Sequence, residues 1–163
     1  MSKKIVITCG ESVVAQHLLA ALETESFSLA VLTMEDVESE QAIAQALGRE
    51  MPNLVVNTLP HGVADSLVTR SSLASRSASL AAVCAEREVP LLHLSSHEVF
   101  GGENKTHYSE QDAPAPINAI GQALWDAERN VQMANEQHII LRLSWVMSAA
   151  SDCVFTRLLQ LLV

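Results

Sequence analysis

Short apolar runs alternate along this chain with longer segments in which apolar residues recur at helical spacing. The runs predict buried strands at residues 4–8, 27–32, 53–57, 90–95 and 138–143. The periodic segments predict helices at residues 12–23, 39–48, 65–88 and 118–136. Strands that alternate with helices are typical of βαβ units. The pattern therefore predicts an α/β, doubly wound fold: a mainly parallel sheet of about five strands with helices on both faces.

Three segments interrupt or end this pattern. Gly48, followed by Pro52, is predicted to stop the second helix. Residues 101–116 form a long irregular segment, and loops of that length in a compact domain usually serve as lids or binding loops. The apolar segment 154–163 predicts a helix that has barely begun. We therefore expect a chain that is either truncated within its fold or completed by another polypeptide.

Length and charge narrow the class of protein. The chain has 163 residues, of which 48% are hydrophobic, enough for one domain with a sizeable core. Its formal net charge of −9 disfavours nucleic acid as a partner, because that binding depends on Lys and Arg contacts to phosphates. The apolar run at residues 5–9 is too short for a signal peptide or a membrane span. We expect a cytoplasmic protein with no membrane partner.

Cysteine and histidine spacing predicts no metal site. Cys9, Cys84 and Cys153 lie far apart, and small buried side chains in a reducing compartment account for them. His93 and His97 are four residues apart, but they fall on a predicted strand and the loop after it, where this spacing does not share a helix face.

Four stretches carry a resemblance to a known family. They are the N-terminal strand, turn and helix, residues 91–102, residues 110–121 and residues 141–146. With them the chain resembles the extended short-chain dehydrogenase/reductases, and within these the dTDP-4-dehydrorhamnose reductase (RmlD-like, sugar-nucleotide-binding) family. The resemblance implies that residues 1–163 form a Rossmann-like NAD(P)-binding-type domain. It also implies that this is the N-terminal part of such a protein, with the C-terminal substrate domain absent.

The catalytic pair of that family has no counterpart here. Its Tyr-x-x-x-Lys motif falls on Ile120 and Leu124, the chain has a single tyrosine, Tyr108, and no lysine follows Lys105. In the family the phenol donates a proton to the substrate carbonyl, which isoleucine cannot do. Ser96 matches the remaining catalytic hydroxyl, and a serine that caps the end of a strand is an equally good interpretation.

The glycine fingerprint for a dinucleotide is also altered. Cys9, Ser12 and Ala15 fall on the three glycine positions, and one displaced glycine, Gly10, remains. Ala15 still permits helix and strand to pack, whereas we expect Cys9 and Ser12 to crowd the phosphate path. Glu11 adds a negative charge where a helix N-terminus would otherwise attract pyrophosphate.

Further positions are assigned to cofactor or core by resemblance alone. Asp36 matches an acidic position near adenine, although an exposed helix-leading aspartate is the simpler interpretation, and Asn57 matches the asparagine after the third strand, beside the cofactor. No basic residue in segment 31–34 is available to read a 2′-phosphate. Arg142 and Trp145 are expected to support the core. The candidate cofactor-binding residues are Gly10, Ser12, Val13, Asp36, Asn57 and Ser95.

These residues leave two classes of function open. The first is a catalytically degenerate RmlD-like protein that acts as a binding, regulatory or assembly module, as a homo-oligomer or with a partner protein. The second is an NAD(P)-dependent nucleotide-sugar reductase or epimerase with unusual catalytic residues. A weaker third hypothesis is a protein that still binds a nucleotide sugar without reaction. NAD(P) is a cofactor by resemblance only.

Overall fold

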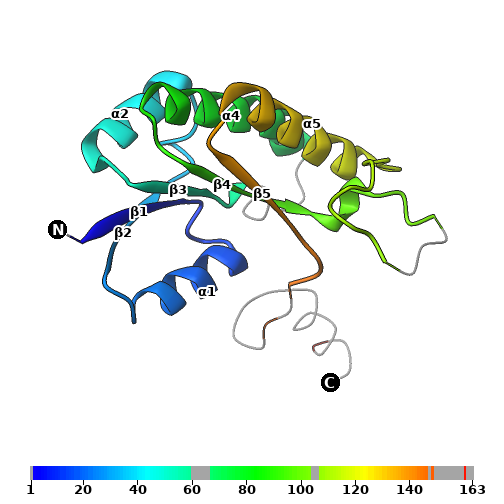
Figure 1. Cartoon of the computed structure of the whole chain (residues 1–163), viewed down its shortest axis with the longest axis horizontal. Coiled ribbons are helices and arrows are strands. Elements are labelled where there is room, and N and C mark those ends of the chain that lie inside the picture. Colours follow the sequence, from blue (N-terminus) through cyan, green and yellow to red (C-terminus); the bar gives the residue numbers. More distant parts are fainter. Residues whose placement is uncertain (1, 60–66, 104–106, 147, 149–159, 161–163) are drawn as a thin grey trace.

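The computed structural model describes residues 2–59, 67–103, 107–146, 148 and 160, with backbone alone for residues 67–71. Five strands form one sheet, all parallel, in the order β2-β1-β3-β4-β5 (Figure 1). The strands are β1 (Lys3–Thr8), β2 (Phe27–Leu32), β3 (Leu54–Asn57), β4 (Leu91–Ser96) and β5 (His138–Leu143). The predicted strand pattern is confirmed, with ends that shift by one residue at most.

Helices cover both faces of the sheet, as predicted. The helices are α1 (Val13–Leu22), α2 (Glu40–Glu50), α4 (Leu67–Glu86), α5 (Ala119–Ala134) and the short 3₁₀ helix η1 (His97–Val99). Figure 1 shows α2, α4 and α5 together on one face and α1 on the other. None of the helices in the described part of the chain combines the length and apolarity needed to cross a bilayer. The predicted helix at residues 154–163 lies outside the described residues, apart from residue 160.

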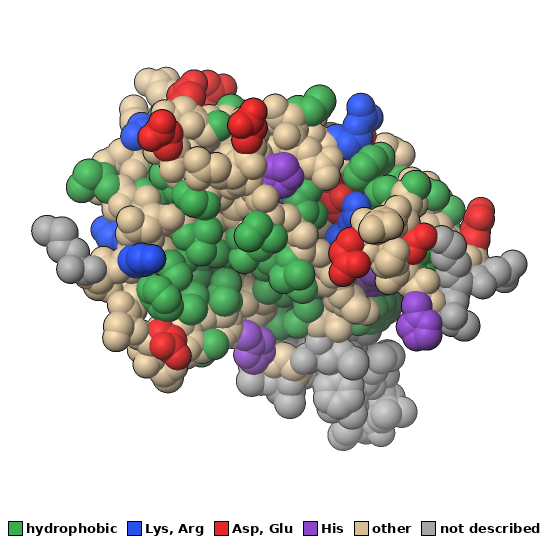
Figure 2. Space-filling view, in the orientation of Figure 1, with side chains coloured by type: hydrophobic (Ala, Val, Ile, Leu, Met, Phe, Trp, Pro, Cys, Tyr) green, Lys and Arg blue, Asp and Glu red, His purple; other side chains and the backbone are tan. Residues whose placement is uncertain are grey.

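Two apolar clusters hold these layers together. The larger lies between the sheet and the three helices, where Val6, Val55 and Leu91 meet residues such as Ile43 and Leu80. The smaller packs α1 onto the opposite face; its buried members are Ile5, Ile7, Ala15, Val56 and Leu94. In the space-filling view, hydrophobic side chains gather across the middle of the visible face, between α1 and the helices of the other layer (Figure 2). Cover on both faces explains why β1, β3 and β4 lack polar alternation, whereas β5 leaves Ile139 and Leu141 exposed.

The second helix differs from its prediction at its C-terminus. α2 continues through Gly48 to Glu50 and ends at Met51, whose φ of 47° is left-handed. An interior glycine costs a helix only about 1 kcal/mol, so Gly48 does not stop it. Pro52 does, because the residue before a proline is disfavoured in the helical region.

Candidate functional site

Parallel strands bring their carboxyl ends to one edge of the sheet, where α/β folds bind ligands. In this chain that edge carries the turn after β1, the loop after β2, the end of β3 and the end of β4 with η1. All of the candidate residues proposed from the sequence belong to these segments or to the start of α5. The structure separates them into groups with different environments.

The turn after β1 keeps a backbone suited to glycine although its first residue is cysteine. Cys9 has a left-handed φ of 48°, and its thiol is buried, with Sγ 3.0 Å from Sδ of Met34. Burial, and secondarily the charge of Glu11, raise the pKa of the Cys9 thiol to about 12. The side chain therefore points into the core, and the expected crowding of the phosphate path by Cys9 is wrong.

Ser12, by contrast, occupies part of the helix N-terminus. Its hydroxyl caps α1 by accepting the backbone N–H of Ala15 at 3.1 Å, so one donor that could face an anion is already used. Gly10 is required by packing, since a Cβ there would lie 2.5 Å from Cγ1 of Val31. Val13 begins the helix and is half-buried, while Glu11 is exposed. The backbone of this turn is therefore compatible with a dinucleotide. Ser12 leaves one N–H donor fewer for the phosphates, and Glu11 adds a negative charge.

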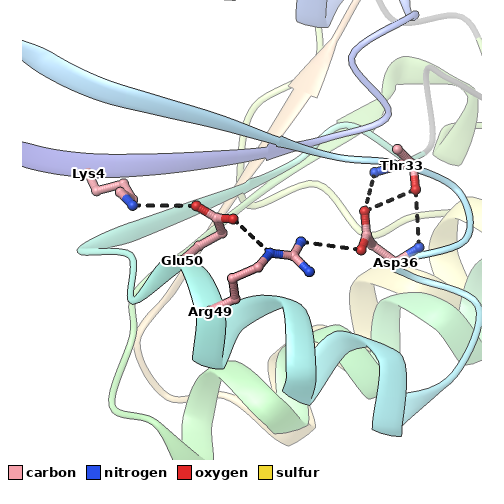
Figure 3. A network of polar contacts seen from close by, with 5 residues as sticks. All are labelled: Lys4, Thr33, Asp36, Arg49 and Glu50. Carbon is pink, nitrogen blue, oxygen red and sulfur yellow. Dashed lines mark hydrogen bonds and ion pairs between the residues drawn. The ribbon is translucent and has the colours of Figure 1, made fainter.

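Asp36 is engaged by its own chain. Its Oδ2 accepts from the backbone and hydroxyl of Thr33, both at 2.9 Å, and Arg49 approaches its Oδ1 at 3.5 Å (Figure 3). These contacts, led by the Thr33 backbone hydrogen bond, hold the pKa of Asp36 below its usual value. Arg49 also contacts Glu50, which binds Lys4. The sequence analysis found no basic residue near the end of β2, because Arg49 belongs to α2 and reaches Asp36 only in the folded chain.

Asn57 belongs to a cluster that is entirely buried. Its Oδ1 accepts the hydroxyl of Thr8 at 3.2 Å and the backbone N–H of Leu59 at 3.1 Å. Its Nδ2 therefore faces Nδ1 of His93 at 2.9 Å and the hydroxyl of Ser77 at 3.4 Å. We call Thr8, Asn57, Ser77 and His93 the buried cluster; each side chain is fully buried.

The buried cluster changes the interpretation of two candidate positions. Asn57 ends β3, as the strand prediction has it, but its side chain is fully buried. Ser95, near the end of β4, is buried as well. Both candidates therefore support the edge from within the core, and neither lies on its surface.

The end of β4 presents a second polar group, the half-exposed cluster of Ser96, His97 and Trp145. The hydroxyl of Ser96 accepts the backbone N–H of Glu98 at 3.4 Å and lies 3.3 Å from Nδ1 of His97. Nε1 of Trp145 lies 3.1 Å from Nε2 of His97. Ser96 caps η1, as the capping interpretation predicted, yet it also remains partly accessible at the edge. The expectation that Trp145 supports the core is wrong, since this residue is 61% exposed.

Packed aliphatic side chains occupy the two positions on which the family's tyrosine and lysine are expected to fall. Leu124 is 3% exposed, and Ile120 packs against the same core cluster. Gly121 lies so close to η1 that a Cβ on it would meet the backbone oxygen of Glu98 at 2.1 Å. The first turn of α5 therefore offers no titratable side chain at Ile120 or Leu124.

A cavity of about 510 Å³ runs from η1 along β5. Beside it, the guanidinium of Arg142 forms a two-pronged ion pair with the fully buried Glu128, with distances of 2.7 Å to 3.2 Å. The same guanidinium lies 4.9 Å from the Phe100 ring, which stacks on Tyr108. Arg142 supports the core, as expected. The cavity lining includes His97, Tyr108, Ser109, Glu110, His138, Arg142 and Ser144, so the long loop after η1 does line a cavity.

Comparison with known proteins adds family evidence to this geometry. The model of the RmlD substrate binding domain family matches residues 3–163. A probable low-salt glycan biosynthesis reductase, Agl14, of Haloferax volcanii is 33% identical over 122 residues, covering 72% of this chain and 41% of its own length. A dTDP-4-dehydrorhamnose reductase of Sinorhizobium fredii is 29% identical over 135 residues, covering 77% of this chain and 44% of its own.

Solved structures agree on the fold. The crystal structure of dTDP-4-dehydrorhamnose reductase from Bacillus anthracis in complex with NADP superimposes with a TM-score of 0.87 at 19% identity. The match covers 99% of this chain and 60% of that one. The chain thus spans less than half the length of the two curated relatives and less than two thirds of the crystallised one.

Proposed function

Because this chain belongs to the RmlD substrate binding domain family, we propose that it forms the dinucleotide-side half of an NAD(P)-dependent nucleotide-sugar reductase. The observation that carries the proposal is Ser96, whose hydroxyl is held at the carboxyl edge of the sheet. The relatives reported above are named as reductases, which supports this hypothesis over a purely regulatory or assembly module.

Ser96 is arranged to donate a hydrogen bond. A hydroxyl oxygen has two acceptor positions. One faces the N–H of Glu98, and the other faces Nδ1 of His97, which carries the hydrogen of the neutral ring because Nε2 accepts from the indole of Trp145. The hydroxyl proton is therefore left for an outside acceptor, such as the carbonyl oxygen of a keto sugar. Donors held in place before the reaction stabilise charge that develops on an oxygen without reorganising.

The turn after β1 would hold the dinucleotide. Its left-handed residue, Cys9, keeps the tight turn, Gly10 keeps the close packing on β2, and the N-terminus of α1 would face the pyrophosphate. When bound, a reduced nicotinamide supplies a hydride to the carbonyl carbon. The Ser12 cap and the charge of Glu11 weaken this binding, so we expect an affinity below that of a turn with three glycines.

A second candidate function is favoured by a specific observation. Ile120 and Leu124, on which the family's tyrosine and lysine are expected to fall, are packed against the core and carry no titratable group. The chain would then bind a nucleotide sugar or a partner without reduction. This hypothesis predicts no turnover under any condition.

A pair of assays on the full chain separates the two candidates. NADPH binding is followed by its fluorescence, and NADPH oxidation is followed with a dTDP-4-keto-6-deoxy sugar as substrate. Binding with turnover supports the reductase, whereas binding of the nucleotide sugar without turnover supports the non-catalytic function. If neither NADPH binding nor turnover is detected, the reductase proposal fails.

A further inference from the structure

We propose that His97 replaces the missing tyrosine as the source of the transferred proton, acting through the hydroxyl of Ser96. This inference rests on the proposed reductase function. His97 is a positioning residue in this scheme, because Ser96 is the group that would touch the substrate. No tyrosine or lysine is needed at positions 120 and 124.

Trp145 determines which nitrogen of His97 carries hydrogen in the resting structure. An indole N–H can only donate, so Nε2 of His97, 3.1 Å from Nε1 of Trp145, must accept. The hydrogen of the neutral imidazole therefore lies on Nδ1, the nitrogen 3.3 Å from the Ser96 hydroxyl. His97 thus donates toward Ser96 and directs the serine proton outward.

Charging His97 displaces Trp145. A proton added to Nε2 would place two donors, the imidazolium and the indole, against each other. Trp145 is 61% exposed, so it can move away without opening the core. The exposed tryptophan therefore acts as a reporter of the protonation of His97.

The proton transfer balances as follows. The Ser96 hydroxyl gives its proton to the substrate oxygen as that oxygen becomes negative, and the imidazolium of His97 gives its Nδ1 proton to Ser96. A bound reduced nicotinamide would supply the hydride that completes the reduction of the carbonyl to an alcohol. His97 is then neutral, with its hydrogen on Nε2, and Nδ1 regains a proton from solvent.

Other titratable groups face His97 and need separate controls. Glu98 adjoins it on η1, while Tyr108 and Glu110 of the following loop and His138 and Arg142 of β5 line the same cavity. Glu98→Gln therefore accompanies every pH measurement. His107→Asn removes an exposed histidine of the loop and serves as the matched control.

The first experiment uses fluorescence and requires no substrate. Trp125→Phe leaves Trp145 as the only tryptophan, and its emission is followed as the pH falls from about 8 to about 5.5, the range in which histidines commonly titrate. We expect a single-group transition that is lost in His97→Asn and kept in His107→Asn and Glu98→Gln. A transition that persists in His97→Asn overturns the inference.

The second experiment measures NADPH oxidation with the dTDP-4-keto-6-deoxy sugar over the same pH range. His97→Asn keeps an N–H near the position of Nδ1 but carries no transferable proton, so kcat should fall about 100-fold or more while KM stays within about threefold. The wild-type rate should rise as the pH falls, and this rise should be absent in His97→Asn.

The outcomes distinguish the two proposals. If the wild type neither binds NADPH nor turns over, the reductase proposal fails, and this inference fails with it. If the wild type turns over and His97→Asn is equally active, only the role of His97 is overturned.

Discussion

Two polar clusters lie near the carboxyl ends of neighbouring strands and differ in their exposure to solvent. The buried cluster joins Thr8 of β1 and Asn57 of β3 to His93 of β4. The half-exposed cluster begins three residues further along β4, at Ser96, and reaches Trp145 beyond β5. The end of β4 thus contributes to two clusters of hydroxyl and imidazole groups, one fully buried and one partly exposed to solvent.

The difference in burial distinguishes a cluster that stabilises the fold from a cluster that a ligand could contact. In the buried cluster, both the side-chain oxygen and the amide nitrogen of Asn57 contact partners inside the protein, so neither atom is left to bind a ligand. In the half-exposed cluster the Ser96 proton remains available. The sequence places both histidines near the end of β4. Only the tertiary structure shows that His93 is fully buried and that His97 is half-buried beside Ser96.

The largest effect is expected beneath the half-exposed cluster, at the ion pair that anchors β5 to α5. Arg142→Met leaves Glu128 buried without its partner, which should lower the free energy of unfolding by about 3–5 kcal/mol in urea titrations. Combining it with Glu128→Gln should recover part of the loss. Arg49→Met, at the exposed network of Figure 3, is the matched control and should change stability little. Equal losses in both variants would contradict the distinction between buried and exposed pairs.

A smaller effect should distinguish the two clusters directly. Asn57→Leu keeps the volume but strands the Thr8 hydroxyl and the Leu59 N–H, and should cost about 2–3 kcal/mol of unfolding free energy. Ser96→Ala, the comparison variant, should cost less than about 1 kcal/mol while abolishing turnover. A Ser96→Ala protein that is as destabilised as Asn57→Leu would mean that Ser96 is a structural cap alone.

Ser12→Gly tests whether the α1 cap weakens cofactor binding. Glycine is tolerated as an N-cap at a cost of a few tenths of a kcal/mol, and the Ala15 N–H is released for an anion. NADPH affinity, measured by fluorescence titration, should rise about three- to tenfold, the value of one hydrogen bond. Ser39→Gly removes the equivalent cap of α2 and should leave that affinity unchanged. If both variants gained NADPH affinity equally, the Ser12 cap would not be what weakens cofactor binding.

The smallest effect concerns Asp36, whose pKa is lowered in the folded protein by Thr33 and Arg49. A lowered folded pKa stabilises the protein above the unfolded pKa of about 3.9, and this contribution disappears as the pH falls through the folded pKa. The urea midpoint of the wild type should therefore exceed that of Asp36→Asn at neutral pH, and the gap should close below about pH 4. A gap that stays constant below about pH 4 would contradict the stabilising role of the Asp36 carboxylate.

Much of the fold could be predicted from the order of residues. Runs such as residues 27–32 and 138–143 have the boundaries of β2 and β5 because short runs rich in apolar and β-branched residues, flanked by polar residues, favour strands. The prediction that the second helix stops at Gly48 was wrong, because a glycine inside a helix is tolerated when the rest of the helix packs well.

The candidate site was predictable only in part. That Ile120 and Leu124 cannot donate a proton follows from residue identity alone, and their assignment to the family's tyrosine and lysine positions stays a prediction. The contact of Trp145 with His97 joins residues 48 positions apart and follows from the pairing of β4 with β5. No spacing rule within one segment could reveal it.

By itself, then, the sequence determined the layers of the domain, its family and the absence of the usual proton donor, because these depend on local periodicity and on residue identity. Tertiary structure alone decided that Cys9 points into the core, that Asn57 is sealed within it and that His97 lies beside Ser96. Those outcomes depend on which side of the sheet each side chain leaves and on what packs there, and both are properties of the assembled layers.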